Sequence, residues 1–355
     1  VTEHINTIVD YSMYWIISLE NYYNMSGDLD FIRMVYPRME SLLRYCMEQT
    51  DGQGFIYGRE GDWIYIDWAE LDKEGTLCAE QLLLARSYEA VASVRRLLGL
   101  DAEEFDVRKE ALLKNIRQFF WDEEKGAFID SYQSGRRNVT RHANIFAVLF
   151  GYADEAQEKA VQKLVEECFG EFQRFPTFLS ARIQDYTDSE IGVPYDLCAA
   201  GRYWCWDFAY WVSQGRRDML EQQLLAVCRQ ARLDDYLMGE RYDMNYIFYQ
   251  DDKNWHGAAH YYEYPCVFIW NLLRGYLGVQ PDLDVDLRIA PMLNKTGRVR
   301  LEAKPYALEY EMKENSFSLT NLLDRQRTFL LCMDGKQKKV ALGAGESLVW
   351  DMTEG

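Results

Sequence analysis

The sequence FIWNLLRGYLG at 268–278, followed by VDLRI at 285–289, contains the change of pattern that decides the fold. Up to this point, apolar residues recur with the spacing of amphipathic helices. Beyond it, apolar and polar residues alternate, which is typical of strands with one buried face. We therefore predict a helical domain over residues 1–278 and a small β domain over residues 279–355.

The residues before this change form a series of apolar stripes with helical spacing. Gly27 is placed to end the first helix, and Asp28 is placed to cap the second. The predicted helices are two within residues 1–50 and one each at 76–98, 105–120, 140–152, 154–169, 196–214, 218–233 and 268–277. A short hairpin is predicted at 121–130. Such helix–turn–helix units close on themselves as a ring of hairpins, so we expect a toroid with irregular loops at one end.

The residues after the change contain six short segments of period two, separated by turns. These segments are 285–289, 299–303, 308–312, 316–319, 328–332 and 347–350. Alternating strands joined by short turns are typical of antiparallel sheets. We therefore expect a mostly α protein, in which a toroid of helical hairpins is followed by a small antiparallel β-sandwich.

The composition favours a neutral partner. The chain has 355 residues, a net charge of −18 and an aromatic content of 15%, including 10 Trp and 25 Tyr. Nucleic acids and anionic membranes require a basic face, which such an acidic chain does not favour. No apolar run approaches the length of a membrane-spanning helix. Aromatic rings stack on the apolar C–H faces of sugars, so a carbohydrate is the expected partner.

The eight cysteines are scattered singly, mostly inside apolar runs. No CxxC pair, no Cys/His ligand spacing and no EF-type calcium loop occurs, so we expect neither a metal nor another cofactor. Buried free thiols suit a reducing compartment, which favours the bacterial cytoplasm. No signal peptide is visible, but a periplasmic or secreted location stays an alternative, because the chain begins with Val1 instead of Met and the absence of a signal is therefore weak evidence. Nothing in the sequence indicates the oligomeric state.

The first candidate site consists of MGERYD at 238–243 and WHGAAHYYEYP at 255–265. Acids, imidazoles and rings alternate there without a helical period, and Gly239, Gly257 and Pro265 interrupt the pattern. Carboxylates that move protons beside rings that hold a sugar are what a glycoside-cleaving site needs. A buried aromatic loop with paired charges is an equally good interpretation. The candidate residues here are Glu240, Trp255, His256, His260 and Glu263.

The second candidate site is the acid- and Trp-rich stretch GDWIYIDWAE at 61–70. The alternative interpretation is a surface loop whose rings cover the core. If this chain holds a complete site, Asp67 or Glu70 is the candidate general acid. The neighbouring Trp63 and Trp68 present apolar faces that raise a carboxyl pKa. We expect this loop and the first site at the same end of the toroid, with Asp62 or Glu70 within roughly 10 Å of Glu240.

Several segments together resemble the bacterial α-L-rhamnosidases of glycoside hydrolase family 78, over nearly the whole chain. Their catalytic domain is a six-hairpin (α/α)6 barrel followed by a C-terminal β-sandwich, so the resemblance implies a six-hairpin (α/α)6 toroid for this chain. The matching segments are Gly61-Asp62-Trp63, which resembles the GDW loop; 124–131 with 142–151, which resemble the mid-barrel signature; 239–243, in place of a WERW-like segment; His260-Tyr261-Tyr262, which resembles the NHY segment; and 287–291, which opens the β domain.

The resemblance implies inverting hydrolysis of terminal L-rhamnose, with Glu240 as the general base. It also implies that Asp62, Trp63 and His260 border the sugar, and we expect Trp68, Trp255, His256 and Glu263 to contact it as well. Two departures matter. The family's general acid lies in a DxPQRDER-like segment one hairpin before the region that matches Val1. Gly239 and Tyr242 also replace the Trp residues that flank the base, which bears on the identity of the sugar.

The departures keep other interpretations open. One is another six-hairpin glycosidase, of the glucosidase or unsaturated-uronyl hydrolase type. Another is a non-catalytic carbohydrate-binding fragment. Without the hairpin before Val1, two apolar stripes should be exposed, and the segment alone should self-associate and show only background hydrolysis. The stripes are Ile5, Ile8 and Ile16 near the start, and Phe268, Leu272 and Leu273 near the end of the helical part.

Overall fold

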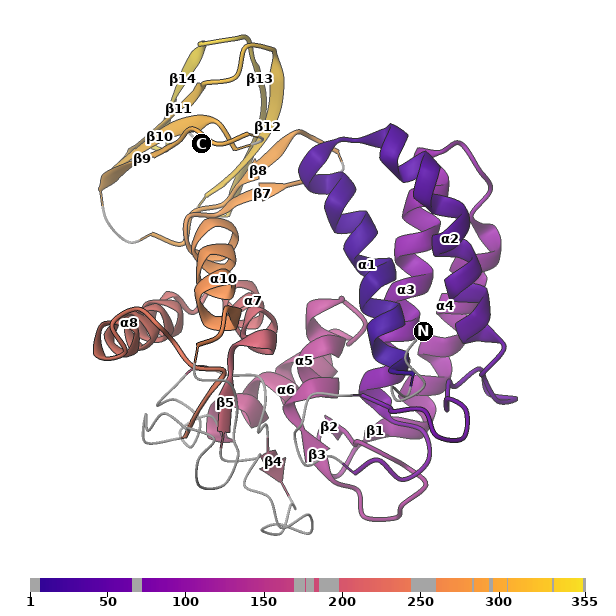
Figure 1. The fold of residues 1–355 in the computed structure, drawn as a ribbon. Helices are drawn as coiled ribbons and strands as arrows, with labels where there is room; N and C mark the ends of the chain where they lie inside the picture. Colours follow the sequence, from indigo (N-terminus) through magenta and orange to yellow (C-terminus); the bar gives the residue numbers. More distant parts are fainter. Residues whose placement is uncertain are drawn as a thin grey trace.

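The computed structural model describes residues 7–65, 72–168, 176, 182–184, 198–243, 260–282, 284–293, 296–304, 306–333 and 335–353. Helices make up the body of the molecule (Figure 1). Two four-stranded sheets lie at one end of the helices, and short strands and loops lie at the other end. Within the described residues, no helix is long and apolar enough to cross a membrane.

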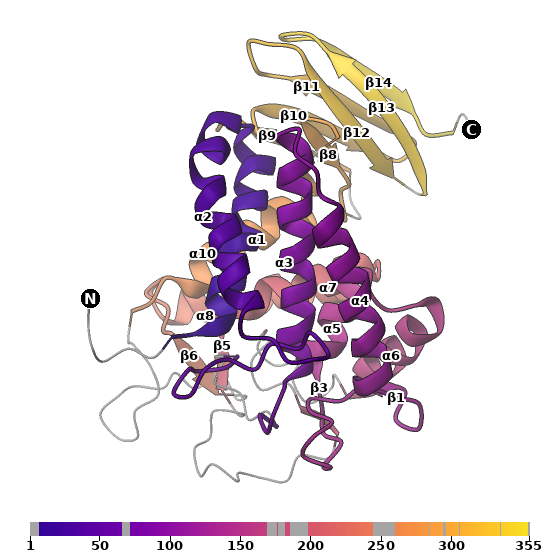
Figure 2. The same ribbon diagram turned by 90° about the vertical axis from the view of Figure 1, so that its right-hand side faces the viewer.

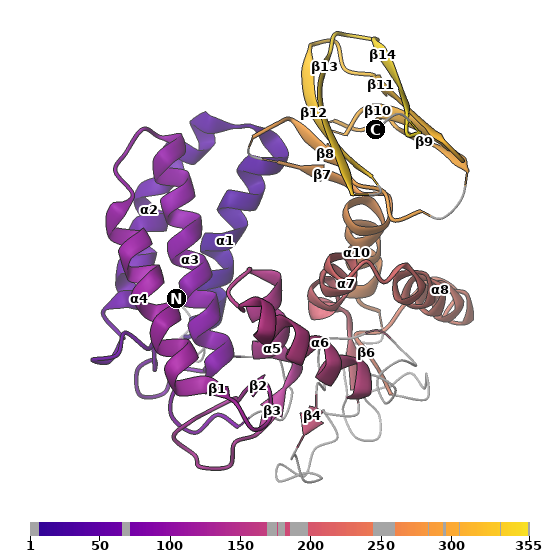
Figure 3. The same cartoon turned by 180° about the vertical axis from the view of Figure 1, so that it is seen from behind.

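The helices pair along the chain as helical hairpins, as predicted. They are α1 Val9–Ser26, α2 Leu29–Met47, α3 Cys78–Leu97, α4 Glu103–Phe120, α5 Arg141–Leu149, α6 Glu155–Cys168, α7 Trp204–Ser213, α8 Arg217–Leu233 and α10 Glu263–Trp270, which continues as a π-helix over Asn271–Tyr276. Helices α1, α3, α5 and α7 contact one another in turn, and each packs on the helix that follows it in sequence. Figures 2 and 3 show α1 to α4 side by side.

Local signals explain several helix ends. Asp28 accepts a hydrogen bond from the backbone N–H of Phe31 at 2.9 Å and so caps α2, as predicted. Gly27 ends α1 in the left-handed conformation, with φ of 65°. Helix α10 begins at Glu263, earlier than predicted, because Pro265 lies in its first turn, where the missing N–H costs nothing.

Short two-stranded sheets form the loop end of the helical part. The strands are β1 Trp121–Asp122, β2 Ala127–Phe128, β3 Val139–Thr140, β4 Arg182–Gln184, β5 Cys198–Ala200 and β6 Arg241–Asp243. The pair β1–β2 is the hairpin predicted at 121–130. The helix predicted from residue 196 is wrong at its start, because residues 198–200 pair with β6 and helix α7 begins at Trp204.

Two sheets enclose a second apolar cluster, as the strand pattern predicts. Their strands are β7 Val279–Pro281, β8 Leu287–Ile289, β9 Gly297–Leu301, β10 Leu308–Lys313, β11 Ser316–Asn321, β12 Arg327–Met333, β13 Lys336–Leu342 and β14 Ser347–Asp351. The orders are β14-β11-β10-β9 and β13-β12-β8-β7. The pair β8–β12 is parallel, which departs from the fully antiparallel expectation. Phe317 and Phe329 bring the two sheets' inner faces into one cluster. The domain boundary after residue 278 stays a prediction.

Of the apolar stripe expected to be exposed near the start of the chain, Ile16 is instead buried and Ile8 is partly buried. Ile16 is fully buried, because the aliphatic face of α1 packs into the core together with Met13 and Ile17. The exposed face of α1 is aromatic and contains Tyr11, Trp15 and Tyr22. At the other end of the helical part, Phe268 and Leu272 are partly buried against the same core, while Ile269 and Trp270 are exposed; Leu273 is partly buried, and Ile5 lies outside the described residues.

Candidate functional site

An ion-paired cluster at the loop end joins two of the predicted site residues through a third residue. Arg202 Nη2 lies 2.6 Å from Glu240 Oε1, and Arg202 Nε lies 3.1 Å from Glu263 Oε1. The backbone N–H of Arg202 also donates to Glu263 Oε2 at 3.1 Å. All three side chains are mostly shielded from solvent. Arg202 therefore fixes the direction of both carboxylates.

The fold brings these residues together through backbone pairing. Strands β5 and β6 pair Ala200 with Arg241, which places the 3₁₀ turn Gly201–Tyr203 beside Glu240. A Cβ at position 201 would lie 2.7 Å from the backbone nitrogen of Tyr264, so only glycine allows this turn to approach α10. Glu263 lies in the first turn of α10, where the helix dipole favours an anion.

Burial and two neighbouring charges shift the pKa of Glu263. Burial raises its pKa, the Arg202 guanidinium opposes that rise, and the nearby Glu240 carboxylate adds to it. The net effect is a raised pKa. A carboxyl group of this kind holds its proton to a higher pH than an exposed glutamate, so it can donate as well as accept hydrogen bonds.

The first turn of α1 connects this cluster with the 61–63 loop. Tyr11 interacts electrostatically with Arg202 and Glu263, and the residue is 44% exposed. Two residues earlier, Val9 N donates to the carbonyl of Trp63 at 3.1 Å, and Trp63 N donates to the carbonyl of Thr7 at 2.8 Å. Both candidate stretches therefore reach the start of α1. The predicted separation of Asp62 or Glu70 from Glu240 stays a prediction.

The structure describes some of the remaining predicted site residues and not others. Asp62 accepts the backbone N–H of Arg59 at 2.8 Å and so stabilises its own turn, while the Trp63 ring is 41% exposed. His260 is exposed, next to Tyr261, whose N–H donates to the Met238 carbonyl at 2.8 Å. This bond brings the two halves of the 238–265 stretch together. Five predicted residues lie outside the described residues: Asp67, Trp68, Glu70, Trp255 and His256.

A buried pair of acids was missed by the sequence reasoning. Asp10, in the first turn of α1, and Glu80, in the first turn of α3, are both fully buried. Neither carboxylate oxygen of Glu80 has a hydrogen-bond partner among the described residues. Burial and the Asp10 charge raise the pKa of Glu80 well above its ordinary value, and Lys73 opposes the rise. Glu80 therefore keeps its proton to a higher pH than an exposed glutamate does.

Other polar groups near the loop end are part of the buried core. His142 is fully buried, and its ring lies 5.4 Å from the Tyr65 ring in an edge-on contact, as expected for a core histidine. Arg141 forms a buried ion pair with Asp207. Tyr242 is also fully buried: its hydroxyl donates to Asp234 at 2.6 Å and accepts the N–H of Gly239 at 2.7 Å. Through these two hydrogen bonds, Tyr242 stabilises the segment that carries Glu240.

Arg202 was also missed by the sequence reasoning. It follows a strand that was predicted as helix, and its partners Glu240 and Glu263 are distant in sequence. The one local signal is Gly201 before it, which a close backbone approach requires. Among the described residues, no group of His, Cys, Asp and Glu has the arrangement of a metal site.

Comparison with known proteins identifies relatives of this architecture. Residues 2–177 match the bacterial alpha-L-rhamnosidase 6 hairpin glycosidase domain. The chain is similar in structure to a GH78 family rhamnosidase of Bacillus sp. GL1, with 20% identity, a TM-score of 0.62 and coverage of 88% of this chain and 31% of that chain. No curated protein matches the sequence.

Two further solved structures share the fold. One is Streptomyces avermitilis α-L-rhamnosidase complexed with L-rhamnose, with 14% identity, a TM-score of 0.56 and coverage of 93% of this chain and 32% of that chain. The other is a GH63 mannosylglycerate hydrolase from Thermus thermophilus in complex with Tris, with 10% identity, a TM-score of 0.52 and coverage of 75% of this chain and 76% of that chain. The chain spans about a third of the length of the two rhamnosidases.

Proposed function

Because residues 2–177 of this chain belong to the bacterial α-L-rhamnosidase six-hairpin glycosidase family, we propose that the chain forms part of an α-L-rhamnosidase-like enzyme. Its reaction is the hydrolysis of terminal L-rhamnose from glycosides or polysaccharides, with inversion at the anomeric carbon. The observation that carries the proposal is the ion-paired cluster, in which Arg202 directs Glu240 and Glu263 toward one place at the loop end.

Inverting hydrolysis needs a base carboxylate that activates water and an acid that protonates the leaving oxygen, roughly 6.5–9.5 Å apart. We assign the base to Glu240. The ion pair with Arg202 holds its carboxylate in one direction, and part of the side chain stays exposed. Asp67 and Glu70 remain the candidates for the acid within this chain. Their place in the sequence follows directly after the Trp63 segment that reaches the start of α1.

We propose that the sugar contacts surround the same place. Because its pKa is raised, Glu263 can both donate hydrogen bonds to sugar hydroxyls and accept hydrogen bonds from them. The exposed rings of Tyr11 and Trp63 offer faces for the C–H side of a sugar. His260 adds a polar group beside Tyr261. Asp62, Trp68, Trp255 and His256 complete the proposed set.

A charge-neutral variant of the base tests this assignment. Glu240→Gln should lower the hydrolysis of an aryl α-L-rhamnoside by about 100-fold or more, because an acid–base group contributes that much. Binding of L-rhamnose, measured by calorimetry, should be retained. Glu123→Gln, on an exposed turn, is the matched control and should leave both unchanged. Unchanged hydrolysis by Glu240→Gln would remove Glu240 from the mechanism.

Two alternatives remain, and the same assay separates them. The likeness to a mannosylglycerate hydrolase favours a six-hairpin glycosidase with another sugar, such as a glucosidase or unsaturated-uronyl hydrolase. A panel of aryl glycosides would then show faster cleavage of a sugar other than rhamnose. A non-catalytic carbohydrate-binding fragment would bind sugar without cleaving any member of the panel, and Glu240→Gln would change little.

A further inference from the structure

A large cavity extends along α7 toward the sheets, beginning at Cys205, three residues after Arg202 of the candidate site. Its volume is about 860 Å³, within the usual range for ligand sites. Its walls come from α7, from α10 and the π-helix, and from strands β8, β12 and β13, so it lies where the helices meet the sheets (Figure 1). Trp206, Phe208 and Trp270 provide aromatic surface.

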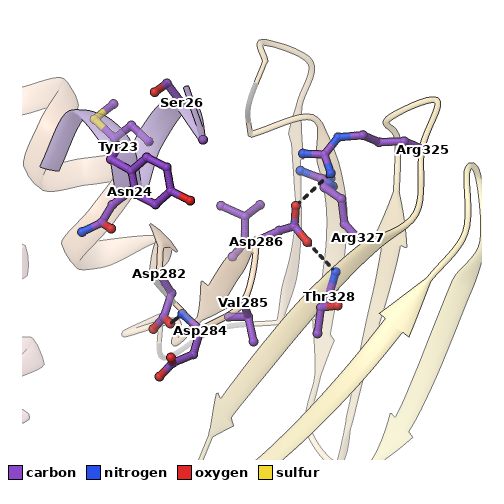
Figure 4. A pocket seen from close by; sticks show the side chains of 13 residues that line it. Tyr23, Asn24, Ser26, Asp282, Asp284, Val285, Asp286, Arg325, Arg327 and Thr328 are labelled. Carbon is purple, nitrogen blue, oxygen red and sulfur yellow. Dashed lines mark hydrogen bonds and ion pairs between the residues drawn. The ribbon is translucent and has the colours of Figure 1, made fainter. Parts of the chain in front are cut away.

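The charges around this cavity are unusual for such an acidic protein. Arg274, Arg288 and Lys336 line it, and no Asp or Glu is among its described lining residues. A smaller cavity of about 310 Å³, between the end of α1 and strands β8 and β12, shows the contrast. There, Asp286 lies 3.1 Å from Arg325 and accepts the N–H of Thr328 at 2.8 Å (Figure 4), so acids and bases face each other.

The two arginines of the larger cavity have no carboxylate partner among the described residues. The Arg274 guanidinium lies 4.3 Å from the centre of the Trp270 ring, and burial lowers its pKa. Neither Arg274 nor Arg288 forms a side-chain hydrogen bond or ion pair within the described part of the chain. Both side chains are partly shielded from water, and a guanidinium in such a place without a carboxylate favours a ligand that supplies the anion.

A third donor adds to the same surface. Asn271 is 2% exposed, and its Nδ2 has no hydrogen-bond partner among the described residues. Lys336 Nζ donates to the carbonyl of Met352 at 3.0 Å, and its positive charge also acts on the carboxylate of Asp351. The charged groups described along the cavity are all cations, and the planar fork of an arginine matches the two oxygens of a carboxylate.

We propose that this cavity binds a carboxylate-bearing saccharide, namely a short oligosaccharide that contains uronic acid. Arg274 and Arg288 pair with the carboxylate, Asn271 donates to an oxygen of the ligand, and the Trp206 and Trp270 rings contact the sugar faces. The preference for an anion follows from the lining alone. The choice of a saccharide rests on the proposed function, since a glycosidase acting on an acidic glycan would hold it at a second place.

Calorimetry with digalacturonate at low salt tests the proposal. Digalacturonate should bind, and Arg274→Gln and Arg288→Gln should each weaken binding by about tenfold or more, because each removes charge-assisted hydrogen bonds. The dimethyl ester of digalacturonate, which lacks the negative charge, should bind at least about tenfold more weakly. Arg229→Gln, an exposed arginine on α8, is the matched control and should change nothing. Thermal unfolding confirms that each variant folds; if Arg274→Gln does not, Arg288→Gln decides.

Three results would overturn the inference. Equal binding of the dimethyl ester would show that charge is not recognised. Binding of inorganic phosphate without binding of digalacturonate would exclude a saccharide. Loss of digalacturonate binding in Glu240→Gln would place the ligand in the candidate active site instead. By contrast, digalacturonate binding that depends on Arg288, in a chain whose hydrolysis is unaffected by Glu240→Gln, would support this cavity while the proposed function fails.

Discussion

Gly201 approaches Tyr264 so closely that a Cβ at position 201 would lie 2.7 Å from the Tyr264 nitrogen. This contact sets the distance between the turn that carries Arg202 and the first turn of α10 that carries Glu263. The ion-paired cluster therefore depends on the absence of a side chain at one position, in addition to the charges themselves.

Gly201→Ala should damage the site and the fold together. The added methyl group meets backbone atoms, so we expect a loss of about 1–3 kcal/mol in the free energy of unfolding. Arg202 should move away from Glu263, with loss of sugar binding. Denaturant unfolding and calorimetry measure the two effects. Gly52→Ala, where a Cβ would meet nothing within 4 Å, is the control and should behave like the parent. An unaffected Gly201→Ala protein would show that this approach is not required.

Arg202→Gln should change the pH dependence of sugar binding or hydrolysis. The Arg202 charge opposes the rise in the pKa of Glu263. Without it, the pKa of Glu263 should rise further, because a nearby positive charge favours the ionised carboxylate. The limb of the pH profile that reports Glu263 should therefore move to higher pH. Arg202→Lys should reverse part of this movement, and Arg229→Gln should show none. An unmoved limb would mean that Glu263 does not govern the profile.

Glu80 should make the folded protein less stable as the pH rises. Its raised pKa means that the folded chain keeps a proton which the unfolded chain releases at about pH 4–5. Stability from this group is therefore complete below that range and is lost as the pH rises toward the folded pKa. Between the unfolded and the folded pKa, each step of one pH unit removes about 1.4 kcal/mol from the free energy of unfolding.

Glu80→Gln should remove this pH dependence, because the amide is neutral at every pH. Thermal unfolding at pH 5 and pH 8 measures it, and the parent should lose more stability over this interval than the variant. Each kcal/mol lost from the free energy of unfolding should lower Tm by about 2–4 °C. Glu123→Gln, which is exposed, should follow the parent curve. A parent curve that rises from pH 5 to pH 8 and is copied by Glu80→Gln would contradict a protonated Glu80.

The aromatic face of α1 should cause self-association of the purified chain. Tyr11, Trp15 and Tyr22 are 44%, 39% and 38% exposed along one helix, and contiguous exposed apolar surface favours association. The double variant Trp15→Ser/Tyr22→Ser should therefore sediment as a smaller species than the parent. Leu225→Ser, which removes a single exposed side chain on α8, should not alter sedimentation. Equal sedimentation of parent and double variant would exclude this face.

Periodicity predicted the helices and strands because burial of one face is a local property of the sequence. It could not predict which face of α1 is covered, since Ile16 and Trp15 are neighbours and both apolar. The parallel pair β8–β12 and the pairing of Arg202 with Glu240 are contacts between distant segments, which local patterns do not encode. Glu240 and Glu263 were found because acids and rings interrupt a helical period there. Asp10 and Glu80 were missed because they occupy helix first turns, where exposed acids are ordinary.

The parallel pairing of β8 with β12 has a consequence for the order in which the chain folds during synthesis. Strand β8 leaves the ribosome soon after the π-helix that ends the helical part, but its partner β12 follows only after β9, β10 and β11. Until then, one edge of β8 has unpaired backbone groups, which are a known cause of misassembly. We expect chains that stop before residue 327 to engage chaperones, even though all the helices described above have already been made.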